Sequence, residues 1–72
     1  MENEWSQLVG EVIAEFTASA DETERAIGAL RETQDYNTAH SLWLHGMKHK
    51  EAKRWIRNLL EEIGYEQSRD RG

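Results

Sequence analysis

The three histidines are the side chains of this sequence best suited to chemistry. His45 and His49 are four residues apart, and His40 is close by. On one continuous helix this spacing would bring two imidazoles together as metal ligands. Gly46 lies between them and is expected to end a helix, and neither an HExxH motif nor a cysteine is present. We therefore expect no metal site and no cofactor, and we interpret the histidines as exposed or partly buried groups that can respond to pH.

The residues that could catalyse a reaction are also poorly placed. Adjacent carboxylates such as Glu61 and Glu62 point in different directions on a helix, so they cannot act as an acid–base pair. The serines have no nucleophile-elbow or phosphate-loop context. Short helices leave little room for a concave pocket. We expect no catalytic residues and no enzyme activity.

Protein binding is better supported, because the chain has three tryptophans in 72 residues. Trp5 and Trp55 lie on apolar helical stripes and are expected in the core. Trp43 lies within Leu42-Trp43-Leu44, and a short helix cannot bury three consecutive side chains against one face. Exposed aromatic and apolar side chains are typical interface anchors. The predicted partner-binding residues are Trp43, Leu44 and Met47.

A basic cluster is the strongest polar feature. It consists of Lys50, Lys53, Arg54 and Arg57. Like charges four residues apart destabilise a helix by a few tenths of a kcal/mol per pair, so a purely structural helix would more often alternate its charges. The cluster either pairs with the acidic first helix, in the same chain or in a second copy, or docks on an acidic partner or on phosphates.

Two short motifs resemble known families. Leu42-x-x-x-Gly46-Met47 followed by Ala52-x-Arg54-Trp55-Ile56-Arg57 resembles a helix-turn-helix over about residues 38–60, although Leu42 stands where that family usually has a small residue. The resemblance implies a set of DNA-facing residues on the last helix. That set is Lys48, His49, Lys50, Lys53, Arg54 and Arg57.

The second motif is Leu42-Trp43-Leu44-His45-Gly46-Met47 with Glu51-Ala52, which is similar to the opening strand and helix of Smr-type nuclease domains. Trp43 replaces the usual acidic residue, and the later HGxG-like segment of that family is missing. This resemblance implies a strand over 41–45, where the apolar spacing predicts a helix.

The elements that position these residues are all expected to be helices, at about 4–18, 21–34, 38–45 and 48–63. Apolar residues recur at three- and four-residue steps in the first and last of them. The apolar faces before and after residues 35–38 would oppose each other on one helix, so we predict a break there. The alternative is a single helix over 21–45 in an intertwined dimer.

Composition sets the frame for these elements. The chain has 38% hydrophobic and 32% charged residues, with no cysteine and no proline. We predict one small all-α domain of three or four helices over 1–65 and a frayed polar tail over 66–72. Apolar runs of at most three residues and an acidic start predict no membrane span and no signal peptide, hence a cytoplasmic protein. A small core without disulfides favours a homo-oligomer.

Charge separates the functional alternatives. Residues 1–35 carry nine acids and two bases, and the formal net charge of the chain is −5. An acidic chain argues against a general nucleic-acid binder. We expect a non-catalytic regulatory or adaptor protein, an inhibitor or modulator of a host or cellular factor, that binds another protein as a homodimer. This profile is typical of small bacterial or phage proteins. The alternative is a helix-turn-helix transcriptional regulator that uses the basic helix 48–63.

Overall fold

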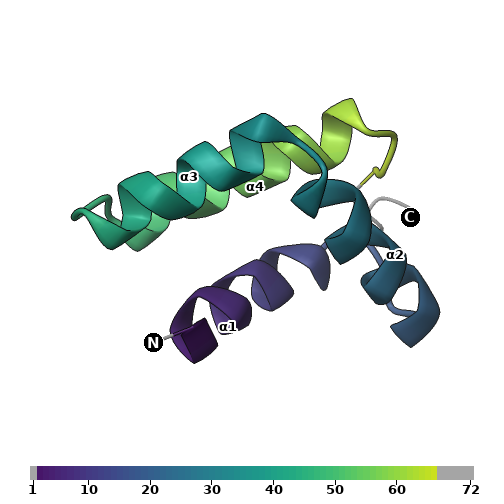
Figure 1. Ribbon diagram of the computed structural model, residues 1–72. Helices are drawn as coiled ribbons and strands as arrows, with labels where there is room; N and C mark the ends of the chain where they lie inside the picture. Colours follow the sequence, from purple (N-terminus) through teal and green to yellow (C-terminus); the bar gives the residue numbers. More distant parts are fainter. Residues whose placement is uncertain (1, 67–72) are drawn as a thin grey trace.

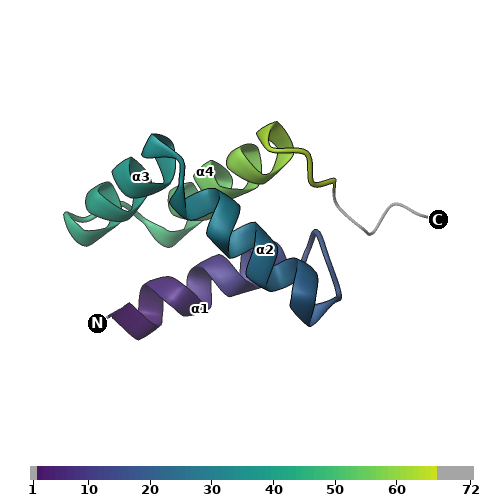
Figure 2. The same cartoon turned by 45° about the vertical axis from the view of Figure 1, so that its right-hand side comes forward.

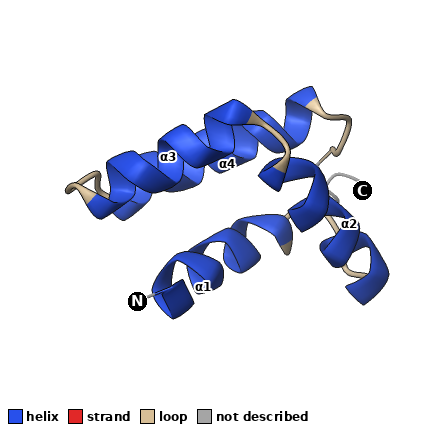
Figure 3. Ribbon diagram, viewed as in Figure 1, coloured by secondary structure: helices blue, strands red, loops and turns tan. Residues whose placement is uncertain are grey.

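The computed structural model describes residues 2–66 and consists of four helices, drawn in Figure 1. They are α1 (Glu2–Ile13), α2 (Ala20–Arg31), α3 (Gln34–Leu44) and α4 (His49–Glu62). Figure 3 shows helices and loops only within this described part of the chain. The predicted all-α fold is confirmed. The strand over 41–45 implied by the nuclease resemblance is wrong, because α3 continues to Leu44. Apart from Glu66, the predicted tail lies outside the described residues.

Two of the four helices, α3 and α4, form a hairpin, and the other two pack against it. α3 and α4 lie antiparallel, side by side, and are joined by a short turn at one end of the molecule (Figures 1 and 2). α1 packs along α4, and α2 lies at the end of the molecule away from the α3–α4 turn. The α3–α4 hairpin therefore leaves its turn and its outer side uncovered by α2.

The core is built from the two apolar stripes that the sequence predicts most clearly. The α1 stripe is buried along its length, from Trp5 to Ile13, and Phe16 joins it from the following turn. The α4 stripe contributes Ala52, Ile56, Leu59 and Leu60. Trp55, which was predicted in the core, is only partly buried, and so is Ile63 just after the end of α4. The edge of the α4 stripe is thus less enclosed than the spacing predicts.

The first helix is shorter than predicted because the chain tightens after Ile13. The amides of Glu15 and Phe16 donate to the carbonyls three residues earlier, at 3.0 and 2.8 Å. This 3₁₀-type turn ends the α-helix but still brings Phe16 into the core. Ser19 then caps α2, its Oγ accepting the Glu22 N–H at 3.3 Å.

The break between α2 and α3 lies earlier than the predicted 35–38. Helix α2 ends at Arg31, and Thr33 is the N-cap of α3, with its Oγ1 accepting the Tyr36 N–H at 3.0 Å. The single helix 21–45 is therefore wrong, and α3 is a turn longer at its start than predicted. Thr33 begins the helix early enough for Tyr36 to be a helical residue that faces the core.

The turn between α3 and α4 follows the predicted glycine stop. Gly46 has φ 115°. Its N–H donates to the Trp43 carbonyl at 3.2 Å, and the Met47 N–H donates to the Leu42 carbonyl at 2.9 Å. These two bonds satisfy carbonyls at the helix end in a Schellman motif, which requires the left-handed conformation that glycine adopts readily. The motif turns the chain back so that α4 can pack against α3.

Candidate functional site

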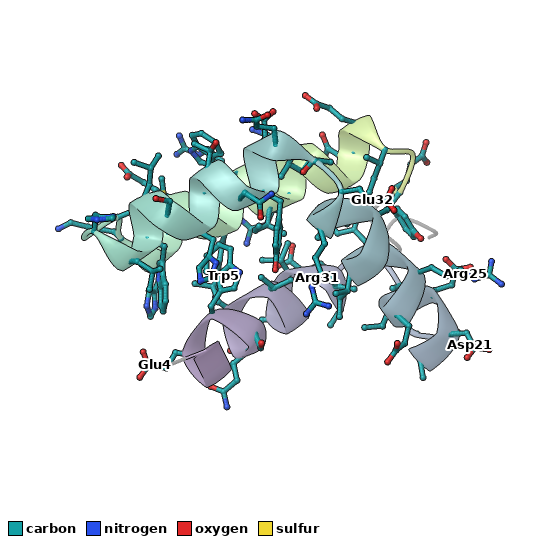
Figure 4. All side chains as sticks on the ribbon, in the orientation of Figure 1. Glu4, Trp5, Asp21, Arg25, Arg31 and Glu32 are labelled. Carbon is teal, nitrogen blue, oxygen red and sulfur yellow. The ribbon has the colours of Figure 1, made fainter. Side chains whose placement is uncertain are left out.

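An aromatic cluster fixes the hairpin to α1. Trp5 lies between α1 and α3 (Figure 4), and its Nε1–H donates to the Tyr36 hydroxyl at 3.0 Å. The His40 ring stacks on Trp5 at 4.8 Å with an interplanar angle of 14°. Trp43 lies 5.4 Å from Trp5, and His49 stacks on Trp43 at 5.6 Å. The cluster holds the end of α3 against both α1 and the start of α4.

Two members of this cluster, Tyr36 and His40, were not predicted as functional or core residues. A signal for them exists, because Tyr36, His40 and Trp43 follow one another at steps of four and three residues, the spacing of one helical face. This spacing was not recognised because a helix break was expected at 35–38, and such a break would place Tyr36 on a different element from His40 and Trp43.

The structure separates the histidines that sequence spacing brings together. His45 is the C-cap of α3, with Nδ1 2.7 Å from the Ser41 carbonyl oxygen, whereas His49 begins α4. Residues 2–66 contain no group of three or more histidine, aspartate or glutamate side chains arranged to hold a metal ion.

The predicted partner-binding residues lie at the turn end of the hairpin. We call Trp43, Leu44 and Met47 the hairpin tip. Trp43 and Met47 are half-buried and pack against the core, whereas Leu44 is 60% exposed. The prediction that residues 42–44 could not all be buried is confirmed, and Leu42 is also 43% exposed. Sequence reasoning did not select Leu42 as a binding residue.

The basic cluster is divided between two environments. Lys53 Nζ lies 2.8 Å from Glu11 Oε1. Arg57 donates two hydrogen bonds to Glu15, from Nε at 2.8 Å and from Nη2 at 3.1 Å. These two bases therefore pair with acidic residues of the same chain, Glu11 in α1 and Glu15 in the turn after it, as one of the two interpretations predicted for the acidic first segment. The other two, Lys50 and Arg54, are exposed.

The Lys53–Glu11 pair leads to a measurable prediction. The hydrogen bond from Lys53, and then its positive charge, lower the pKa of the Glu11 carboxyl below its ordinary value. The Lys53–Glu11 pair therefore stabilises the folded protein at pH values above the pKa that Glu11 has in the unfolded chain. This stabilisation is lost as the pH falls through the lower pKa that Glu11 has in the folded protein. We expect K53M to return the Glu11 pKa towards the ordinary value, as measured by NMR titration of the side-chain carboxyl. R54M, at an exposed neighbour, should leave it unchanged, and equal shifts in the two variants would contradict the pairing.

Two surface hollows flank α3. One has a volume of about 320 Å³ and lies beside the aromatic cluster, lined by Trp5, Ser6, Arg31, Tyr36, Asn37 and His40. Figure 4 shows Arg31 on the side of α2 that faces α1. The other hollow, of about 220 Å³, lies between α3 and α4 and is lined by Asp35, Arg54, Trp55, Asn58, Leu59 and Glu62. We call this second hollow the outer groove.

None of the four described helices has the length and apolar character that a bilayer span requires. Comparison of the chain with protein-family models, with curated proteins and with solved structures finds no match.

Proposed function

We propose that this protein is a non-catalytic regulator or adaptor that acts as a homodimer and binds another protein through the hairpin tip. The observation that carries the proposal is Leu44, the last residue of α3, whose side chain is 60% exposed. Full burial of a leucine side chain contributes about 1.5–3 kcal/mol of favourable free energy, and most of the Leu44 side chain is not buried by its own chain. Half-buried Trp43 and Met47 come from the same turn, pack against the core and provide an apolar base beside Leu44.

The charges around the tip indicate the character of the partner. Lys48 and Lys50 are exposed beside it, in a protein whose net charge is −5. Complementary charges around an apolar anchor accelerate association and orient the partner. The partner surface proposed here has an apolar pocket for Leu44 and acidic side chains around that pocket.

The geometry supports protein binding more than the DNA-binding alternative. Two of the six residues in the DNA-facing set already form ion pairs: Lys53 with Glu11 of α1, and Arg57 with Glu15 in the turn after α1. Helix α4 also lies side by side with α3 over its length, whereas helices of a helix-turn-helix cross at about 90–120°. The other four residues of the set form no ion pair within residues 2–66, and fewer available cations mean weaker phosphate binding.

Binding measurements on tip variants test the proposal. The tagged protein captures partners from a lysate of the source organism, and dissociation constants are then measured with the purified partner. L44D introduces a charge into the apolar contact and is expected to weaken binding at least about 30-fold, the effect of a hot spot worth about 2 kcal/mol. K50E should weaken it less and mainly slow association.

A18D is the matched control, because Ala18 is exposed in the loop before α2, away from the tip, and receives the same charge. It should bind like the unmodified protein, and circular dichroism should show the same helicity for all variants. Unchanged affinity for L44D would contradict the proposal. Capture of duplex DNA, with affinity falling steeply with salt and lost in K50E and R54E, would support the alternative instead.

A further inference from the structure

The outer groove contains an incompletely buried tryptophan. Trp55 lines it and is only partly buried, whereas Trp5 in the core is 4% exposed. Leu42 lies two helical turns after Asp35 on the same face of α3 and is 43% exposed. The outer side of the hairpin thus combines an indole and a leucine that their own chain does not fully cover.

The charges of the outer groove are ordered along α4. Arg54 lies four residues before Asn58, and Glu62 lies four residues after it. A helix rises about 1.5 Å per residue, so the two charges lie about 12 Å apart, too far to pair with each other. Asp35 lines the groove from α3, whose first turn lies beside the last turn of antiparallel α4, and so adds to the acidic end.

These charges have no ion-pair partner in the described part of the chain. Within residues 2–66, neither Arg54 nor Glu62 nor Asp35 has an ion pair within 4.0 Å, in contrast to Lys53 and Arg57 on the side of α4 that faces α1. The groove therefore presents an unpaired cation at one end, unpaired carboxylates at the other, and an apolar and amide surface between them.

We propose that the outer groove is the homodimer interface and that a second copy of this chain occupies it. If two α4 helices cross antiparallel at Asn58, a two-fold axis places Arg54 of each copy opposite Glu62 of the other. The equal four-residue spacing on both sides of Asn58 makes the groove its own electrostatic complement, which is the requirement for an isologous contact. Trp55 and Leu42 of both copies then lose solvent contact.

This inference deepens the homodimer part of the proposed function and depends on it, but it uses a different face from the hairpin tip. The tip extends from the turn end of the hairpin, whereas the groove runs along its outer side. A dimer formed through the groove leaves both tips free, so one assembly can present two copies of Leu44.

Charge-reversal variants test the arrangement directly. In a homodimer of R54E, two glutamates face each other at both ends of the contact, and in a homodimer of E62R two arginines do so. Each variant is expected to weaken dimerisation at least tenfold, as measured by analytical ultracentrifugation at low salt. A heterodimer of R54E with E62R has a glutamate opposite an arginine at both ends of the contact, so an equimolar mixture of the two should dimerise again. The double variant R54E/E62R likewise has an attractive pair at both ends in its homodimer. The double variant should therefore dimerise like the unmodified chain.

Matched controls carry the same charge changes outside the groove. K50E corresponds to R54E, and E61R corresponds to E62R. Both residues are exposed on α4 and do not line the groove, so both variants should remain dimeric. Circular dichroism should show equal helicity for all variants.

Four results would overturn the inference. An unmodified protein that stays monomeric at millimolar concentration rules out the groove dimer, whatever L44D does to partner binding. A dimer that persists in both R54E and E62R, or a double variant that dimerises no better than the single ones, places the interface elsewhere. Loss of the dimer in L44D alone assigns the dimer interface to the hairpin tip, in which case the groove inference fails and only the homodimer part of the proposed function remains supported.

Discussion

Replacing Trp5 with alanine is expected to lower the free energy of unfolding by about 3–5 kcal/mol. Trp5 is 4% exposed, contacts three aromatic rings of α3 and donates a hydrogen bond to Tyr36. A chain of 72 residues has a total stability of about 4–11 kcal/mol, so this single substitution removes much of it. Urea denaturation followed by far-ultraviolet circular dichroism measures the loss.

The matched control for this prediction is W55A. It removes the same side chain from a position that is only partly buried, at the edge of the core. Its effect on the free energy of unfolding should be clearly smaller, because fewer contacts and less buried area are lost. Equal losses for the two variants would show that the aromatic cluster around Trp5 does not anchor α1 to the hairpin.

Leu30→Ala is expected to lower the free energy of unfolding by about 3–5 kcal/mol. The substitution should destabilise the packing of α2 more than that of the other helices. Leu30 is fully buried, and Ala26 is the other buried residue of this helix. Shortening Leu30 to alanine leaves α2 anchored mainly by Ala26 and by half-buried side chains. Hydrogen exchange should therefore show faster exchange of α2 amides relative to those of α4.

Ile27→Ala provides the comparison within the same helix. Ile27 is only partly buried, so its truncation should destabilise the protein less and leave α2 exchange nearer to its original rate. If both variants accelerated α2 exchange equally, Leu30 would not be the main anchor of α2.

The type and order of the helices could be predicted because the stripes of α1 and α4 are long and regular. The ends of the helices could not be predicted, because several neighbouring residues can form capping hydrogen bonds of similar strength there. Thr33, Asp35, Asn37 and Thr38 are all residues that favour helix caps, so composition alone does not select one of them. The contact between Tyr36 and Trp5 favours Thr33, and that contact joins residues 31 positions apart.

Which residues of the basic cluster form ion pairs also depends on contacts between segments far apart in the sequence. Glu11 and Glu15 are four residues apart, as are Lys53 and Arg57, and α1 lies along α4 in the register that pairs them. The equal spacing was visible in the sequence, but the parallel direction of the two helices was not. The exposure of Leu44 was predictable from three consecutive apolar residues, whereas the partial exposure of Trp55 was not, because its spacing matches that of the buried α4 stripe.

The pairing of the first helix with the last also affects biosynthesis. Arg57 and Glu15 are 42 residues apart, whereas α3 and α4 are neighbours in the sequence. At about 5–20 residues per second, α1 leaves the ribosome a few seconds before α4 is complete. During that interval the apolar face of the first helix lacks the α4 side chains against which it packs in the folded protein. The α3–α4 hairpin joins neighbouring segments and can close as soon as both have emerged, whereas the contact between α1 and α4 requires the whole of α4.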